Sequence, residues 1–190
     1  LDRLCTDACK PEEWWTGGFG GCFENEWFGG PWPSKEAISL SINHLELMTL
    51  VGALKVWGPR LRGQRITLRT DNQVAAAALN KGTARDPALA FLVREAYALM
   101  LEHSFNARAL YLPGKENDLA DLPSRLKFDE FAKAYAASSR LARFGPARRI
   151  SVDPSFFDDW LATCCTLKAE QQQQQQTPSR PRWARRRRRR

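Results

Sequence analysis

The sequence lacks any apolar run near the ~20 residues that a membrane-spanning helix requires. It also lacks a secretory signal-peptide pattern at its start. These absences predict an intracellular protein that stays out of membranes, and they do not distinguish the nucleus from the cytoplasm. The chain begins at Leu1 rather than at methionine, so we expect a processed piece or a fragment of a longer reading frame.

Histidine and cysteine are too few and too irregularly spaced to predict a zinc site. There are two histidines, His44 and His103, and the five cysteines contain no two CxxC pairs. We therefore expect reduced thiols and no structural zinc.

Acidic residues are absent from residues 177–190, which hold eight arginines. Subtracting these eight from the 29 basic residues leaves 21, which equals the 21 acidic residues, so residues 1–176 have a formal net charge of zero. An arginine tail can attach to phosphate backbones or act as a nuclear address, but a solvated disordered end is at least as good an interpretation. Together with the glutamine run at 171–176, the tail predicts disorder over 169–190.

Periodicity and turn residues predict mixed strands and helices over residues 1–126. The expected strands are 1–6, the hairpin partners 18–23 and 27–30, then 65–70 and 105–112. The expected helices are 42–57, 74–79, one that begins at Pro87, and 116–126. This order, βββαβααβα, predicts an α/β fold with a mixed sheet and flanking helices.

Residues 127–168 are expected to form a helical extension of unknown role. One amphipathic helix is predicted over 128–141, and another begins at Asp153-Pro154. The predicted organisation is thus a domain at 1–126, the extension, and a disordered end at 169–190.

Glycines and tryptophans are concentrated between residues 14 and 32. Glycines in strands permit close approach of another backbone. The tryptophans could stack on nucleobases, but we favour packing in the core and at its edge. They are Trp14, Trp15, Trp27 and Trp32.

Two acidic residues follow predicted strands. Asp7 comes after the first strand and Asp71 after the strand at 65–70. Ligand sites in open α/β sheets gather at the carboxyl ends of strands, so these carboxylates could be neighbours. Taken singly, Asp7 could be a turn residue and Asp71 a helix N-cap.

Two further acids lie in predicted helices. Glu46 borders the apolar stripe of helix 42–57 and could meet a metal, but a capping box with Asn43 explains it equally well. Asp121 lies near the start of helix 116–126, where it could simply complement the helix dipole.

Four converging carboxylates without histidine or cysteine suit Mg²⁺ or Mn²⁺. Two such ions ~3.5–4 Å apart can hold the attacking and leaving oxygens of a phosphodiester. The ions would also relieve the mutual repulsion of the carboxylates.

Five motifs occur in order along the chain: Thr6-Asp7-Ala8, Ser41 to Leu47, Leu68 to Asn72, Asn80 to Gly82, and Leu112 to Arg125. This ordered set resembles the ribonuclease H domain of retroelement reverse transcriptases, and within that family it is most similar to elements that also encode a tyrosine recombinase (DIRS-like). The strongest matches are TDN and PGxxNxxAD. The resemblance covers about residues 4–126.

The resemblance implies a five-stranded mixed sheet and cleavage of the RNA strand of RNA/DNA hybrids. It implies that Asp7, Glu46, Asp71 and Asp121 are catalytic metal ligands for Mg²⁺ or Mn²⁺, as two ions. It makes Asn72 and Asn117 candidates for substrate contact or for support of the ligands. An upstream reverse transcriptase domain is an implied partner.

The sequence departs from the family pattern at two places. Tyr111 stands where many relatives have histidine, and Pro123 interrupts the usual ADxLSR. Pro123 either kinks the helix after Asp121 or places Asp121 just before a helix. The alternatives to an active hydrolase are a weakly active or inactive nucleic-acid-binding remnant, and a different nuclease or integrase-like protein.

Overall fold

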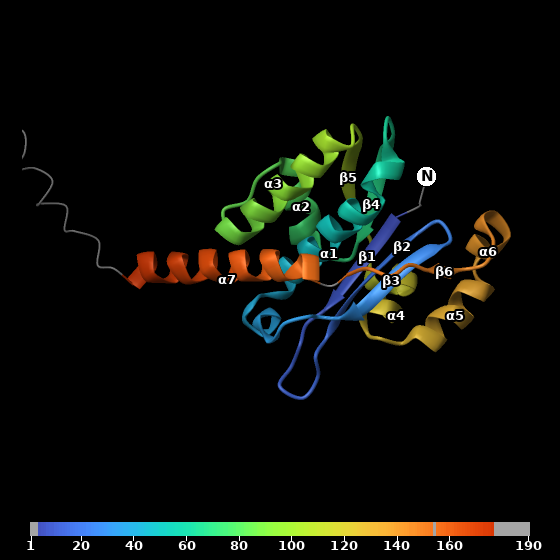
Figure 1. The fold of residues 1–190 in the computed structure, drawn as a ribbon, viewed down its shortest axis with the longest axis horizontal. Helices are drawn as coiled ribbons and strands as arrows, with labels where there is room; N and C mark the ends of the chain where they lie inside the picture. The colour runs from blue at the N-terminus through green and yellow to red at the C-terminus, as the bar shows by residue number, and fades with distance from the viewer. Residues whose placement is uncertain (1–3, 154, 177–190) are drawn as a thin grey trace, which may run out of the picture.

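A mixed sheet forms the centre of the computed structural model, which describes residues 4–153 and 155–176 (Figure 1). Within these residues the sheet has six strands in the order β5-β4-β1-β2-β3-β6. The strands are β1 (Leu4–Cys9), β2 (Gly18–Phe23), β3 (Glu26–Pro31), β4 (Arg65–Thr70), β5 (Asn106–Tyr111) and β6 (Arg148–Arg149). The helices are α1 (Ile42–Trp57), α2 (Gln73–Lys81), α3 (Pro87–Glu102), α4 (Asp118–Ser124), α5 (Phe128–Ala137), α6 (Ser139–Phe144) and α7 (Ser155–Gln176). Short 3₁₀ turns are η1 (Lys35–Ser39), η2 (Gly58–Leu61) and η3 (Gly114–Glu116).

The sheet combines an antiparallel and a parallel half. Strands β1, β2 and β3 pair antiparallel, whereas β1, β4 and β5 pair parallel. The α/β class and the predicted order βββαβααβα are confirmed as far as α4. A sixth strand, β6, adds to the five that the sequence predicted, because two residues of the extension pair with the β3 edge.

Alternate residues of β1 face two different packed layers. Leu4 and Ala8 belong to the larger core, which lies under α1, α3 and α7. Cys5 packs on the other face with residues of α4 and α5. Helix α1 is buried continuously from His44 to Leu54 because it lies between the sheet and the outer helices. The predicted amphipathic α1 is therefore an interior helix.

Helix α4 rests almost directly on the sheet because glycines lie beneath it. A Cβ placed on Gly20 would lie 2.7 Å from the Ser124 amide nitrogen and 2.8 Å from the Ala120 carbonyl oxygen. A Cβ on Gly29 would meet the Pro123 ring at 2.7 Å. These glycines have the role that the sequence predicted for them, close approach of another backbone.

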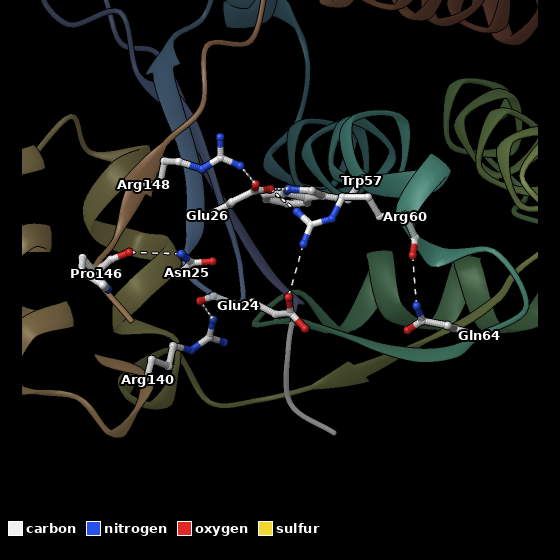
Figure 2. Close-up of polar contacts among 9 residues, drawn as sticks. All are labelled: Glu24, Asn25, Glu26, Trp57, Arg60, Gln64, Arg140, Pro146 and Arg148. Atoms are coloured by element: carbon white, nitrogen blue, oxygen red, sulfur yellow. Dashed lines mark hydrogen bonds and ion pairs between the residues drawn. The ribbon is translucent and has the colours of Figure 1, made fainter. Parts of the chain in front are cut away.

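Polar contacts join the extension to the β2–β3 hairpin, through Arg148 and Pro146 of the extension (Figure 2). Glu26 is 6% exposed and accepts hydrogen bonds from the indole of Trp57 at 2.9 Å and from the guanidinium groups of Arg60 and Arg148. The side-chain amide of Asn25 donates a hydrogen bond to the carbonyl oxygen of Pro146 at 3.2 Å. A buried carboxylate needs such partners to offset its lost hydration.

The extension differs from its prediction at two places. The single helix expected over 128–141 is two helices, because the Ser138 hydroxyl accepts a hydrogen bond from the Arg140 amide and so begins α6. Helix α7 continues through the glutamine run to Gln176, where disorder was expected from 169. Glutamine, alanine and glutamate are good helix formers, which explains the continuation. Residues 177–190 and the first three positions of the expected first strand lie outside the described residues.

Within residues 4–153 and 155–176, no helix has the length and apolar content that crossing a membrane requires.

Candidate metal centre

Asp7 lies inside β1 rather than after it, which corrects the sequence expectation. It pairs with Gly20 across the β1–β2 ladder and is 4% exposed. Its Oδ2 accepts a hydrogen bond from the Ser124 hydroxyl at 2.5 Å. A turn role for Asp7 is excluded, because the strand continues to Cys9.

Glu46 is buried in α1 and is 2% exposed. Its Oε1 accepts from the Ala8 amide at 3.0 Å and its Oε2 from the Thr70 hydroxyl at 3.4 Å. The capping explanation does not hold, because the capping box of α1 is formed by Ser41 and His44. Glu46 therefore joins the helix to β1 and β4 instead of closing the helix end.

Asp71 directly follows β4, as the sequence predicted. It is not the N-cap of α2: that residue is Asn72, whose Oδ1 accepts from the Ala75 amide at 2.9 Å. The Asn72 amide group also donates to Asn43 Oδ1 at 2.9 Å. Gly114 lies against Asp71, since a Cβ there would be 3.1 Å from Asp71 Oδ2.

Three carboxylates converge from β1, α1 and the residue after β4. One oxygen each of Asp7, Glu46 and Asp71 lies within 4.8 Å of the others. This all-oxygen donor set suits hard cations such as Mg²⁺ and Mn²⁺. The residues present therefore fit a divalent metal site.

Burial and mutual repulsion raise the pKa values of all three acids. Burial raises the pKa of Asp7 to about 7, and the charges of Asp71 and Asp121 add to this. Burial and the nearby Asp7 raise the pKa of Glu46 well above its usual range. Burial and the charge of Asp121 raise the pKa of Asp71. Such shifts are the expected signature of carboxylates that a cation would neutralise.

Asp121 lies close enough to act electrostatically on Asp7 and Asp71, but it is not in the convergent group of three. Its Oδ1 accepts from Arg125 Nε at 2.6 Å, and its side chain is 35% exposed. Asp121 is in the first turn of α4, so an interaction with the helix dipole also fits. Pro123 lies within α4, two residues after Asp121, and packs on Gly29.

Asn117 is 2% exposed, and its amide group donates to the Thr6 carbonyl oxygen at 3.0 Å. This bond attaches the residue before α4 to the strand position just before Asp7. The sequence left open whether Asn117 contacts the substrate or supports the metal ligands, and its buried position favours support of the ligands.

Two residues at the site were missed by sequence reasoning, Ser124 and Thr70. Their hydroxyls contact Asp7 and Glu46 respectively. Both lie in the motif stretches, but serine and threonine are common, and only the folded geometry distinguishes these two. Of the tryptophans, Trp27 and Trp32 are buried as expected, whereas Trp14 is 81% exposed.

Solved structures resemble this fold. Ribonuclease H1 from the archaeon Halobacterium salinarum NRC-1 superposes with a TM-score of 0.50 and 18% identity, over 67% of this chain and 96% of that one. LC11-RNase H1 in complex with an RNA/DNA hybrid superposes with a TM-score of 0.52 and 16% identity, over 71% and 98% of the two chains. The fold is ribonuclease H-like. No protein-family model matches the sequence, and no curated protein matches it.

Proposed function

We propose that this chain is a metal-dependent endonuclease that cleaves the RNA strand of RNA/DNA hybrids. The observation that carries the proposal is the convergence of Asp7, Glu46 and Asp71 in a ribonuclease H-like fold. The structural neighbour LC11-RNase H1 was solved with an RNA/DNA hybrid, which supports the same class of substrate here.

Each residue has a role that follows from its contacts. Asp7, Glu46 and Asp71 would hold Mg²⁺ or Mn²⁺, with Asp121 as a fourth ligand that completes the donors for two ions. The bound cations would supply charge neutralisation and Lewis acidity. Ser124, Thr70 and the Ala8 amide fix the carboxylates before any cation binds, and such fixed supports strengthen metal binding.

Substrate contact is assigned to the rim of the site. Asn72 is half-buried beside Asp71, where it would contact the hybrid, while Asn117 would act from beneath as a support. The hybrid would be recognised through its shape and its ribose 2′-hydroxyls. The motifs further support an origin in a retroelement reverse transcriptase, with a polymerase domain upstream.

A weakly active nucleic-acid-binding remnant is the second candidate. The ion pair between Asp121 and Arg125 favours it, because it ties the fourth ligand to a cation of the chain itself. An active enzyme would have to exchange this ion pair for a metal ion.

Cleavage of a labelled RNA/DNA hybrid, with and without Mg²⁺ or Mn²⁺, separates the two candidates. We expect metal-dependent cleavage that Asp71→Asn lowers by more than about 100-fold, since losing even a supporting partner of a metal ligand costs about 10–100-fold. Asp118→Asn is the matched control, because Asp118 is an exposed acid of α4 and should leave cleavage unchanged. Hybrid binding without cleavage in either metal would establish the remnant instead.

A further inference from the structure

Two cysteines face each other across the β1–β2 ladder, on the sheet face covered by α4 and α5. Cys5 and Cys22 are direct partners in the antiparallel register, and both belong to the smaller core cluster. The Cys5 thiol donates to the Cys22 carbonyl oxygen at 3.7 Å.

The register places these residues where a disulfide fits. Opposed residues of an antiparallel pair have Cα atoms about 4.5 or 5.5 Å apart, and disulfides span Cα distances of about 4.4–6.8 Å. Side chains opposite each other also leave the same face of the sheet. The two sulfurs could therefore join without a change in strand pairing.

A polar group and a small pocket distinguish this pair from ordinary core cysteines. The Arg140 guanidinium lies against both sulfurs, 3.2 Å from Cys22 Sγ and 3.9 Å from Cys5 Sγ. Arg140 also donates to the Glu24 carbonyl oxygen, as Figure 2 shows. A pocket of about 220 Å³, lined partly by Cys5, Asn117 and Arg140, reaches Cys5. Since a water molecule fills about 30 Å³, an oxidant of the size of hydrogen peroxide has room to enter.

We propose that Cys5 and Cys22 form a reversible redox site, which hydrogen peroxide converts into a cross-strand disulfide. The sulfur of Cys5 attacks one peroxide oxygen, the O–O bond breaks, and water leaves with the thiol proton, so Cys5 becomes a sulfenic acid. The sulfur of Cys22 then attacks the Cys5 sulfur, the S–OH bond breaks, and a second water leaves. The two thiols lose two electrons in total and the peroxide gains them.

This assignment is independent of the proposed nuclease. It departs from the ordinary interpretation of a buried cysteine as a small apolar residue. Cys164 fits that ordinary interpretation, because it is fully buried in the larger core and its thiol donates to a backbone group, the Ala88 carbonyl oxygen, at 4.0 Å. It is therefore the internal control.

The test is peptide mapping of the reduced full chain after brief exposure to hydrogen peroxide and blocking of remaining thiols with N-ethylmaleimide. We expect a Cys5–Cys22 peptide that is 2 Da lighter than the two thiol peptides, formed at least tenfold faster than any oxidation of Cys164. Dithiothreitol should restore both thiols. In urea the selectivity for this pair should disappear, because the fold creates it.

Two variants identify the order of events. Cys22→Ser should block the disulfide and leave Cys5 as a sulfenic acid that dimedone traps, whereas Cys164→Ser should change nothing. If the folded wild-type chain yields no Cys5–Cys22 peptide while Cys9 or Cys165 is oxidised, the proposal is wrong. Because that outcome is read on the wild-type chain, it holds even if Cys22→Ser fails to fold.

Discussion

The carboxyl group of Asp7 couples the candidate site to the stability of the chain. The residues that face it are Asp71, Asp121, Glu46, Ser124 and Arg125. In the folded chain without metal its pKa is raised by burial to about 7, from 3.8. Since the folded state holds this proton more tightly, the contribution of Asp7 to stability is greatest below pH 4 and is lost as the pH rises through 7.

We therefore predict that Asp7 lowers the free energy of unfolding of the metal-free chain by about 4 kcal/mol between pH 4 and pH 8, at about 1.4 kcal/mol per pKa unit. Chemical denaturation at several pH values, with and without Mg²⁺ or Mn²⁺, measures this. Asp7→Asn should reduce this dependence of stability on pH, and bound metal should stabilise the wild-type chain most at high pH. An equal pH dependence in wild type and Asp7→Asn would contradict the prediction.

The sequence predicted the identity of the clustered acids better than their surroundings. Asp71 follows its strand as expected, but Glu46 had an equally good capping explanation. The capping explanation fails because the N-cap of α1 is Ser41 and not Asn43. Sequence periodicity does not locate the start of a helix to within two residues. Asp121 could not be placed from sequence, because its position depends on how Pro123 packs on Gly29.

Among the elements, α4 is the one whose position the site depends on most. It carries Ser124 and Asp121, and it approaches β2 only because Gly20 has no side chain. The Cβ of an alanine at Gly20 would lie within 2.9 Å of backbone and side-chain atoms of α4. Helix and strand would have to separate.

Gly20→Ala is predicted to destabilise the chain by about 1–3 kcal/mol, the usual cost of overpacking, and to weaken Mn²⁺ binding. Thermal unfolding and calorimetric titration measure the two effects. Gly30→Ala is the matched control and should leave Mn²⁺ affinity intact, because the three atoms nearest its Cβ would belong to the Phe19 ring, at 3.3 Å or more, and not to α4. Unchanged Mn²⁺ affinity in Gly20→Ala would show that the metal site does not depend on the close approach of α4 to β2.

The order of elements as far as α4 was predictable because each is marked by local signals such as Asp86-Pro87 before α3. Strand β6 was not, because two residues carry no periodic pattern and their pairing partner lies about 120 positions away. The split between α5 and α6 depends on one serine hydroxyl. Non-local contacts of this kind are what single-sequence patterns miss.

At the scale of the whole molecule, the extension shares the core of the sheet. Phe157 of α7 is fully buried. Its ring centroid lies 4.5 Å from that of Phe19 and 5.4 Å from that of Trp32. The extension predicted from residue 127 therefore contributes side chains to the same core as the sheet.

Phe157→Ala should lower the free energy of unfolding by about 3–5 kcal/mol, as for other buried phenylalanines. Its neighbour Phe156 is only partly buried, so Phe156→Ala should cost clearly less. Denaturant titration of both variants gives the comparison. Equal, small effects would mean that α7 is dispensable for the core.

The arginines of residues 177–190 are predicted to strengthen nucleic-acid binding without contributing to cleavage. Deleting these residues should lower affinity and reduce the slope of log K against log salt by up to about 7, if all eight arginines contact phosphates. Filter binding at several salt concentrations measures the slope. Loss of cleavage at saturating hybrid would contradict the prediction.

The short strand β6 also changes which backbone groups the sheet edge exposes. An uncovered strand edge offers unpaired amides and carbonyls to any passing strand. Along β3 and its turn, three alternate carbonyl oxygens are already occupied: Asn25 by the Arg148 amide at 2.7 Å, Trp27 by the Ile150 amide at 2.9 Å, and Gly29 by the Arg149 side chain at 2.8 Å. A few residues of the extension thus occupy the edge of β3, and the edge strand of the sheet on this side is instead β6, which has only two residues. Very short edge strands are one way in which proteins limit pairing with other chains.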